Sequence, residues 1–262
     1  MFSLDLTGKS ALIAGSSQGI GLAAAQALAD LGATCFLIAR NEERLQKALS
    51  TLDTSKNQQH RYLVADFSKP QEVRASAEKL ASETIIHILV NNTGGPAAGS
   101  ISDAIPEAFQ SAFEQHLICN HLLTTTLVAG MKKAGYGRVI NVISTSVKVP
   151  LKNLGVSNTI RGAVASWAKT FANELASYGI TVNNVLPGAT STARLENIIS
   201  NKVKKTGITE DAATEEMLSE IPAKRFGKPE EIAAMIAFLA SPLAGYVNGT
   251  SIPVDGGRTG CL

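Results

Sequence analysis

The stretch Ser10-Ala-Leu-Ile-Ala-Gly15-Ser-Ser-Gln-Gly19-Ile-Gly21 decides the fold of this chain. Its first five residues form a short and almost uniformly apolar run, which is typical of a strand buried on both faces. Glycines at the spacing G-x-x-x-G-x-G follow at once and lead into a helical pattern. Such glycines let the backbone approach a pyrophosphate at a helix N-terminus. A plain structural turn is the alternative, but the position between the first strand and the first helix favours a dinucleotide site.

The alternation of short apolar runs and helical patterns continues along the chain. We expect strands at 10–14, 34–39, 62–65, 85–90, 139–143 and 181–186, and helices at 20–31, 42–52, 70–82, 106–133 and 157–178. A last helix and strand are expected at 229–239 and 251–254. Alternating strands and helices predict parallel βαβ units with right-handed crossovers. The fold class is therefore α/β, with a doubly wound parallel sheet in one domain over 1–262.

Residues 189–227 form the one stretch that does not fit this alternation. They are polar and charged, with apolar residues at positions such as Leu195, Ile198 and Met217. The stretch is too long for an ordinary connection, so we expect a helical lid over a substrate. The same apolar positions would equally suit packing on the domain.

Composition and charge exclude several classes of function. The 262 residues carry a formal charge of +2, which argues against a nucleic-acid or membrane surface as partner. No apolar run approaches the length of a spanning helix, and we do not expect a signal peptide at the N-terminus. Cys35, Cys119 and Cys261 have no metal-binding or redox spacing, so we expect no metal site and a reducing, cytoplasmic setting.

Further motifs follow the later strands in a recurring order. Asn91-Asn-Thr-Gly94 follows the fourth strand, Pro187-Gly188 follows the sixth, and Pro253-Val-Asp-Gly-Gly257 lies near the C-terminus. Together with the glycine turn and Asp66, these motifs resemble the short-chain dehydrogenase/reductase family over nearly the whole chain. The resemblance implies a Rossmann-type fold. It also implies cofactor contacts from Gly15, Ser17, Gln18, Gly19, Ile20, Gly21, Arg40, Asp66, Phe67, Asn92, Gly94, Arg161, Pro187, Gly188, Thr190 and Thr192.

The end of the second strand indicates which dinucleotide is bound. A 2′-hydroxyl of NAD(H) favours an acidic acceptor there, whereas a 2′-phosphate favours a guanidinium. The strand ends in Ala39-Arg40-Asn41, with no carboxylate before Glu42. We therefore expect NADP(H) rather than NAD(H). The alternative is that Arg40 is a surface residue paired with Glu42 or Glu43.

The catalytic positions implied by the resemblance carry unusual residues. In the family, a Ser precedes a Tyr-x-x-x-Lys motif, and an Asn lies on the preceding helix. Here Ser144 is present, but the Tyr, Lys and Asn positions fall on Ser157, Arg161 and His116. Serine is a far weaker acid than tyrosine, and arginine stays charged, so the ordinary mechanism cannot operate unaltered. Loss of a general acid typically lowers the rate by ~10²–10⁴.

Another group could supply the proton. His116 is the best candidate, because imidazole titrates near neutrality. A buried histidine satisfied by the backbone is an equal alternative. Lys148 and Lys152 lie between Ser144 and Ser157, but solvated loop lysines are the simpler interpretation.

These observations lead to two hypotheses about function. The first is an NADP(H)-dependent oxidoreductase with a carbonyl or alcohol substrate, for which similarity to 3-oxoacyl thioester reductases suggests a 3-oxoacyl thioester. The second is a non-catalytic NADP(H)-binding sensor, regulatory subunit or partner in a mixed oligomer. Small residues at Ala165, Ala168 and Ala172 on the catalytic helix, with the resemblance, imply a homotetramer or homodimer.

Overall fold

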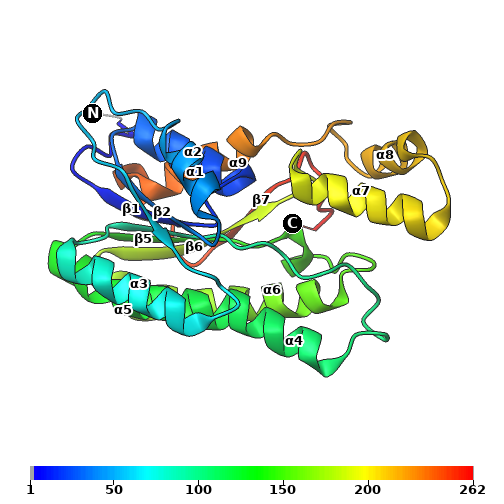
Figure 1. The fold of residues 1–262 in the computed structure, drawn as a ribbon, viewed down its shortest axis with the longest axis horizontal. Helices are drawn as coiled ribbons and strands as arrows, with labels where there is room; N and C mark the ends of the chain where they lie inside the picture. Colours follow the sequence, from blue (N-terminus) through cyan, green and yellow to red (C-terminus); the bar gives the residue numbers. More distant parts are fainter. Residues whose placement is uncertain (1–2, 262) are drawn as a thin grey trace.

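A computed structural model describes residues 3–261 and shows one sheet of parallel strands between two layers of helices (Figure 1). The strand order is β3-β2-β1-β4-β5-β6-β7. The order reverses between β1 and β4, which is the switch point where open α/β sheets bind their ligands. The expected doubly wound sheet is confirmed. The strands are β1 (Ser10–Ala14), β2 (Thr34–Ala39), β3 (Arg61–Val64), β4 (Ile88–Asn91), β5 (Gly137–Val142), β6 (Ile180–Pro187) and β7 (Ser251–Val254).

The helices divide between the two faces of the sheet (Figure 1). One face is covered by α1 (Gly19–Asp30), α2 (Glu42–Leu49) and α9 (Pro229–Ala240). The other face is covered by α3 (Pro70–Glu83), α5 (Cys119–Ala134) and α6 (Gly155–Leu175), with α4 (Pro106–Phe113) against α6. No helix within 3–261 has the length and apolarity to cross a membrane.

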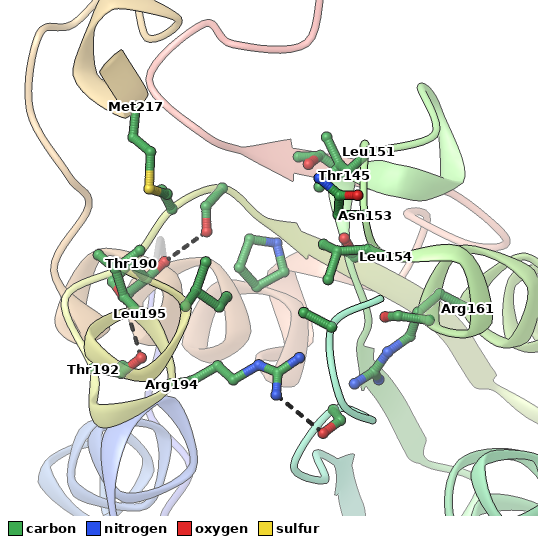
Figure 2. A pocket seen from close by; sticks show the side chains of 18 of the residues that line it. Thr145, Leu151, Asn153, Leu154, Arg161, Thr190, Thr192, Arg194, Leu195 and Met217 are labelled. Carbon is green, nitrogen blue, oxygen red and sulfur yellow. Dashed lines mark hydrogen bonds between the residues drawn. The ribbon is translucent and has the colours of Figure 1, made fainter. Parts of the chain in front are cut away.

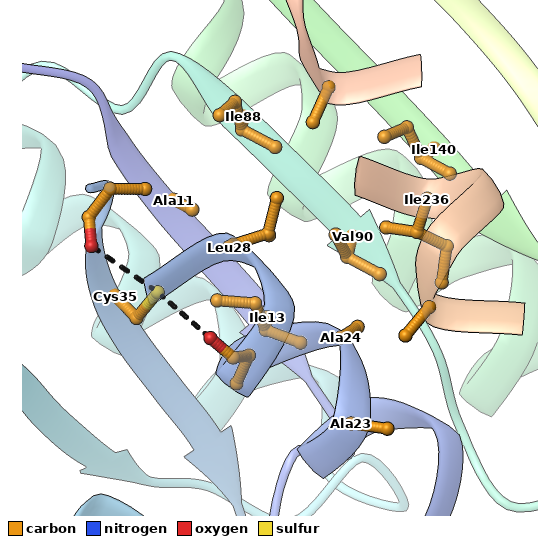
Figure 3. Packing of buried hydrophobic residues seen from close by; sticks show 14 of the residues in the cluster. Ala11, Ile13, Ala23, Ala24, Leu28, Cys35, Ile88, Val90, Ile140 and Ile236 are labelled. Carbon is orange, nitrogen blue, oxygen red and sulfur yellow. Dashed lines mark hydrogen bonds between the residues drawn. The ribbon is translucent and has the colours of Figure 1, made fainter. Parts of the chain in front are cut away.

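Alternating side chains of the central strands explain why both faces are covered. In β1, Ala11 and Ile13 pack in the cluster under α1 and α9, whereas Leu12 and Ala14 pack in the cluster on the other face. Figure 3 shows Ile13 beside Leu28 of α1 in the first cluster. Successive residues of a strand point to opposite faces, so a strand covered on both faces must be apolar throughout.

The boundaries of several predicted elements shift by one to three residues. The third strand begins at Arg61 rather than residue 62, and the fourth begins at Ile88 rather than residue 85. The predicted helix 106–133 is α4 and α5 joined by a π-helical turn, Glu114–Ile118. The stretch 189–227 contains α7 (Ala193–Thr206) and α8 (Glu210–Ser219), while its role as a lid stays a prediction.

Candidate active site

A cavity of about 1270 Å³ lies beyond the carboxyl ends of the central strands. It extends from the glycine turn, past the loops after β4 and β5, to α7 and α8 (Figure 2). Most of the predicted site residues line it: Gly15, Gln18, Gly19, Ile20, Asn92, Gly94, Ser144, Ser157, Arg161, Pro187, Gly188, Thr190 and Thr192. The residues that do not line it are Ser17, Gly21, Arg40, Asp66, Phe67 and His116.

The glycine turn has the geometry that a bound pyrophosphate requires. Gly15 and Gly19 have φ angles of +59° and +56°, a region that side chains disfavour. A Cβ on Gly15 would lie 2.5 Å from the carbonyl oxygen of Asn92, and one on Gly19 would lie 3.3 Å from Thr192. Only glycine therefore lets the turn approach both the loop after β4 and the segment after β6.

The N-terminus of α1 is left open for an anion. Its N-cap residue, Gln18, makes no side-chain capping bond, and the first turn holds no acidic residue. The first N–H groups of a helix have no partner within the helix, and they carry the positive end of its dipole. The turn and this helix end together fit the pyrophosphate of a dinucleotide.

Arg40 follows the end of β2 and forms no ion pair within residues 3–261. Its side chain is exposed, and the proposed pairing with a neighbouring carboxylate is not what the structure shows. Glu43 pairs with Lys47 instead, at 2.7 Å, and Glu42 accepts a hydrogen bond from the Tyr62 hydroxyl. The alternative interpretation of Arg40 as a surface ion pair is therefore wrong.

Two further charged side chains follow β3 and β2 in this region, outside the lining of the cavity. Asp66 follows β3, and its pKa is lowered mainly by a backbone hydrogen bond from Ser68, with a smaller contribution from Arg40. Arg44 of α2 donates to Oε1 of Gln18 at 2.9 Å, and the sequence did not single it out. Arg44 lies in the first turn of a surface helix, where the sequence pattern does not distinguish it from any solvated arginine.

The turn after β6 is tied together by its own side chains. The Thr190 hydroxyl donates to the carbonyl oxygen of Gly188 at 3.1 Å, and the Thr192 hydroxyl donates to that of Thr190 at 3.2 Å (Figure 2). A Cβ on Gly188 would lie 2.7 Å from Cα of Asp255. Glycine at position 188 therefore lets the turn after β6 pack directly against the segment after β7.

His116 is buried against the loop after β4. It lies in the π-helical turn, a distortion that is frequent at functional sites, and only 1% of its surface is exposed. Its Nδ1 lies 2.5 Å from the hydroxyl of Thr93. Burial, with the charges of Arg161 and Arg194, lowers its pKa to about 2. His116 is therefore neutral near pH 7, which favours the buried histidine over the proton donor, and its partner is a threonine hydroxyl rather than the backbone.

Arg161 reaches the centre of the site from α6. Only 7% of its surface is exposed, and it donates to the carbonyl oxygens of Val142 at 3.1 Å and Thr93 at 3.4 Å. Burial, and then the charge of Arg194, lower its pKa to about 10. Arg161 therefore stays protonated at neutral pH despite its burial.

The two serines stand on either side of the loop between β5 and α6. Oγ of Ser144 accepts from the backbone N–H of Ser146 at 3.1 Å and so caps the short 3₁₀ turn Thr145–Val147. Ser157 lies in the first turn of α6, one helical turn before Arg161. Of the two loop lysines, Lys152 lines the cavity and Lys148 does not.

Arg194 of α7 is a cavity residue that the sequence did not indicate. Its guanidinium points to the loop after β4 (Figure 2). It donates to the carbonyl oxygens of Gly95 at 3.3 Å and Pro96 at 2.7 Å. Thr93, the partner of His116, was also missed. Both contacts join residues far apart in the sequence, and no local pattern marks them.

A row of buried amides fixes the strands beneath the site. Nδ2 of Asn91 donates to Asn141 at 2.9 Å, Asn141 donates to Asn184 at 2.9 Å, and Asn184 donates to Ser251 at 3.0 Å. The row crosses β4, β5, β6 and β7 at one level. The row fixes the register of these four strands, and the loops of the cavity follow three of them, β4, β5 and β6.

The parallel sheet, its switch point and the glycine turn are those of a dinucleotide-binding α/β protein. Residues 14–259 match the family model described as enoyl-(acyl carrier protein) reductase. The chain belongs to the short-chain dehydrogenase/reductase family.

Individual relatives match over nearly their whole length. The chain is 31% identical over 251 residues to the NADPH-dependent reductase BacG of Bacillus subtilis, with coverage of 95% of this chain and 97% of the relative. It is 33% identical to the 3-oxoacyl-[acyl-carrier-protein] reductase FabG of Vibrio cholerae, with coverage of 97% and 98%. A structure of L-sorbose reductase from Gluconobacter frateurii, complexed with NADPH and L-sorbose, superposes with a TM-score of 0.93 at 33% identity and covers 100% of both chains.

Proposed function

We propose that this protein is an NADP(H)-dependent oxidoreductase that acts on a carbonyl or alcohol group, and that its active site is atypical for the family. One observation carries the proposal. A single cavity joins the glycine turn to Ser144, Ser157 and Arg161, so a dinucleotide and a second molecule have room beside the same side chains. The finding that relatives are named as reductases and dehydrogenases supports the oxidoreductase class.

Support for NADP(H) comes from two directions. Arg40 is exposed and has no ion-pair partner among the described residues, so its guanidinium is available to a 2′-phosphate. A relative named as NADPH-dependent and a neighbouring structure complexed with NADPH agree with this assignment. When bound, the cofactor would supply or accept a hydride.

The residues of the chain would then position the substrate oxygen and stabilise charge on it. The hydroxyls of Ser144 and Ser157 can donate hydrogen bonds to that oxygen. The protonated Arg161 can stabilise negative charge that develops there. Neither group gives up a net proton readily at neutral pH, so we propose that the proton comes from bulk solvent and reaches the substrate oxygen through the cavity, relayed by a serine hydroxyl. His116, expected as a catalytic residue, becomes a positioning residue that holds Thr93 and the loop after β4.

The substrate class is also a proposal. A 3-oxoacyl thioester is the first candidate, on similarity to the FabG relatives. The apolar side chains of Leu195, Ile198 and Met217 line the cavity from α7 and α8, where an acyl chain could lie. The stretch 189–227 would then act as the lid.

We also propose a homodimer or homotetramer in the cytoplasm. The aromatic rings of His121, Trp167 and Phe171 form a cluster between α5 and α6. The ring centroids of Trp167 and Phe171 are 4.9 Å apart. A second copy of the chain would cover this cluster. The cytoplasm is proposed on the spacing of Cys35, Cys119 and Cys261, which are free thiols in the structure.

The test is a titration of the purified protein with NADPH and NADH, followed by energy transfer from Trp167, its single tryptophan. We expect NADPH to bind more tightly, and the variant Arg40→Ala to lose about tenfold or more of that preference because one charge-assisted bond is removed. Arg74→Ala, which removes an exposed charge on α3, is the matched control. Absence of binding by either nucleotide would refute the proposed function.

A second measurement separates an enzyme from a nucleotide-binding sensor. Oxidation of NADPH is followed with a panel of ketones, 3-oxoacyl thioesters and sugars. Turnover that is lost in Arg161→Met supports the enzyme. Binding of NADPH without turnover of any of these compounds favours the sensor.

A further inference from the structure

Two guanidinium groups meet at one short loop of the cavity. Arg161 comes from α6 and donates to Thr93, whereas Arg194 comes from α7 and donates to Gly95 and Pro96. Figure 2 shows Arg194 and Arg161 on the two sides of this loop. The charge of Arg194 is close enough to lower the pKa of Arg161, so the two cations repel each other.

No carboxylate within residues 3–261 forms an ion pair with either guanidinium. The two acidic residues that line the cavity are already engaged, Glu216 by Lys202 and Glu220 by Arg258. An uncompensated buried charge is costly, and a second charge beside it raises the cost.

Both arginines retain unused hydrogen-bond donors. A guanidinium has five N–H donors, and Arg161 donates hydrogen bonds to only two acceptors among the described residues, both of them backbone carbonyl oxygens. A carboxylate or phosphate accepts two parallel bonds from such a fork. Lys152 and Lys205 also line the cavity without an ion-pair partner in the described part of the chain. They add positive charge to the cavity beyond that of the two arginines.

We propose that the substrate is an anion, a carbonyl or alcohol compound whose acid group lies between Arg161 and Arg194. The inference rests on the proposed function, because it places this acid group beside Ser144 and Ser157. It narrows the substrate class to oxo or hydroxy acids and their phosphorylated counterparts, and it displaces the 3-oxoacyl thioester as first candidate, because a thioester carries no acid group beside its ketone. The acid group would neutralise the two cations and hold the reacting carbon at a fixed distance from the serines.

A different occupant of the arginine pair is the dinucleotide, which the resemblance places against Arg161 and whose charged group here is its pyrophosphate. The open N-terminus of α1 and the glycine turn already provide a place for that group. The two cases differ in what a change at Arg194 does. If Arg194 holds the cofactor, its loss weakens NADPH binding, and if it holds the substrate, NADPH binding is unchanged.

The experiment uses the full chain saturated with NADP⁺ and measures binding of small anions by calorimetry. Oxalate, pyruvate and inorganic phosphate are the probes, and oxamide is the uncharged counterpart of oxalate. We expect at least one anion to bind and oxamide not to bind. Arg194→Gln and Arg161→Met should each lower the affinity for the anion by about tenfold or more, because each removes a guanidinium that donates charge-assisted hydrogen bonds. Lys133→Gln, which removes an exposed charge at the end of α5, should change nothing.

Arg194→Gln is the variant on which the outcome depends if Arg161→Met does not fold, because Arg194 is exposed enough to replace safely. Binding of none of the anions to protein that binds NADP⁺ would overturn the inference and leave the proposed function standing. Weaker NADPH binding in Arg194→Gln, with anion binding unchanged, would overturn it in favour of the cofactor. Failure of the protein to bind NADP⁺ at all would instead remove the proposed function.

Discussion

Replacement of Gly21 by alanine should loosen the whole cofactor turn. A Cβ at this position would lie 2.8 Å from Nδ2 of Asn92 and closer still to the carbonyl oxygen of Gly15. Nonbonded carbon contacts are most favourable near 3.5–4.0 Å, so the turn has to retreat from α1 by roughly 1 Å. The obstacle is backbone on one side and a hydrogen-bonded amide on the other, and neither can swing away.

The expected loss of stability follows from two opposing terms. Overpacking of this kind costs up to ~3 kcal/mol, and the better helix propensity of alanine returns ~1 kcal/mol. A net loss of about 2 kcal/mol corresponds to a fall in Tm of roughly 4–8 °C for a chain of this size. The affinity for NADPH should fall as well, because the displaced turn no longer presents its N–H groups to the pyrophosphate.

Urea denaturation and NADPH titration of Gly21→Ala measure both effects. Gly130→Ala is the control, because Gly130 lies inside α5 and a Cβ there would meet only Ile85 at an ordinary 3.5 Å. This control should be stabilised by about 0.5–1 kcal/mol. A Gly21→Ala protein as stable as the control, with unchanged affinity for NADPH, would refute the packing that we ascribe to the turn.

Three other changes test separate parts of the structure. The folded-state pKa of His116 lies below its ordinary value of 6.5, so its contribution to stability is full above pH 6.5 and is lost as pH falls below it. Between pH 7 and 5.5 the free energy of unfolding should drop by about 1 kcal/mol more in the wild type than in His116→Asn. Urea denaturation at the two pH values measures this drop, and an equal drop in both proteins would contradict the assignment. Asn141→Leu should lower the free energy of unfolding by about 3 kcal/mol, because it leaves the side-chain amide of Asn91 and the side-chain carbonyl of Asn184 unpaired. A change near zero would mean that the amide row does not stabilise the fold. The triple variant with Asn, Tyr and Lys at positions 116, 157 and 161 should gain reduction of an ordinary ketone, whereas no gain in NADPH oxidation would indicate a cavity remodelled for another substrate.

Local patterns predicted much of the fold. The apolar run at 10–14 and the glycines after it could be interpreted from local sequence alone. Burial on two faces and a positive φ each restrict which residue type can occupy a single position. The same holds for helix ends, such as the left-handed Gly135 that closes α5. Boundaries were less secure at β4, where Ile85 and Ile86 are apolar but lie before the first paired residue.

The sequence by itself determined the strand–turn–helix order, the place of the cofactor turn and the identity of Ser144, Ser157 and Arg161 at the site. Only the tertiary structure decided how those residues behave. The pKa of His116 depends on burial and on two arginines from other helices. The approach of Arg194 to Gly95 joins residues 99 positions apart. Desolvation and Coulomb interactions depend on distance in space, so a linear pattern does not contain them until the chain has folded.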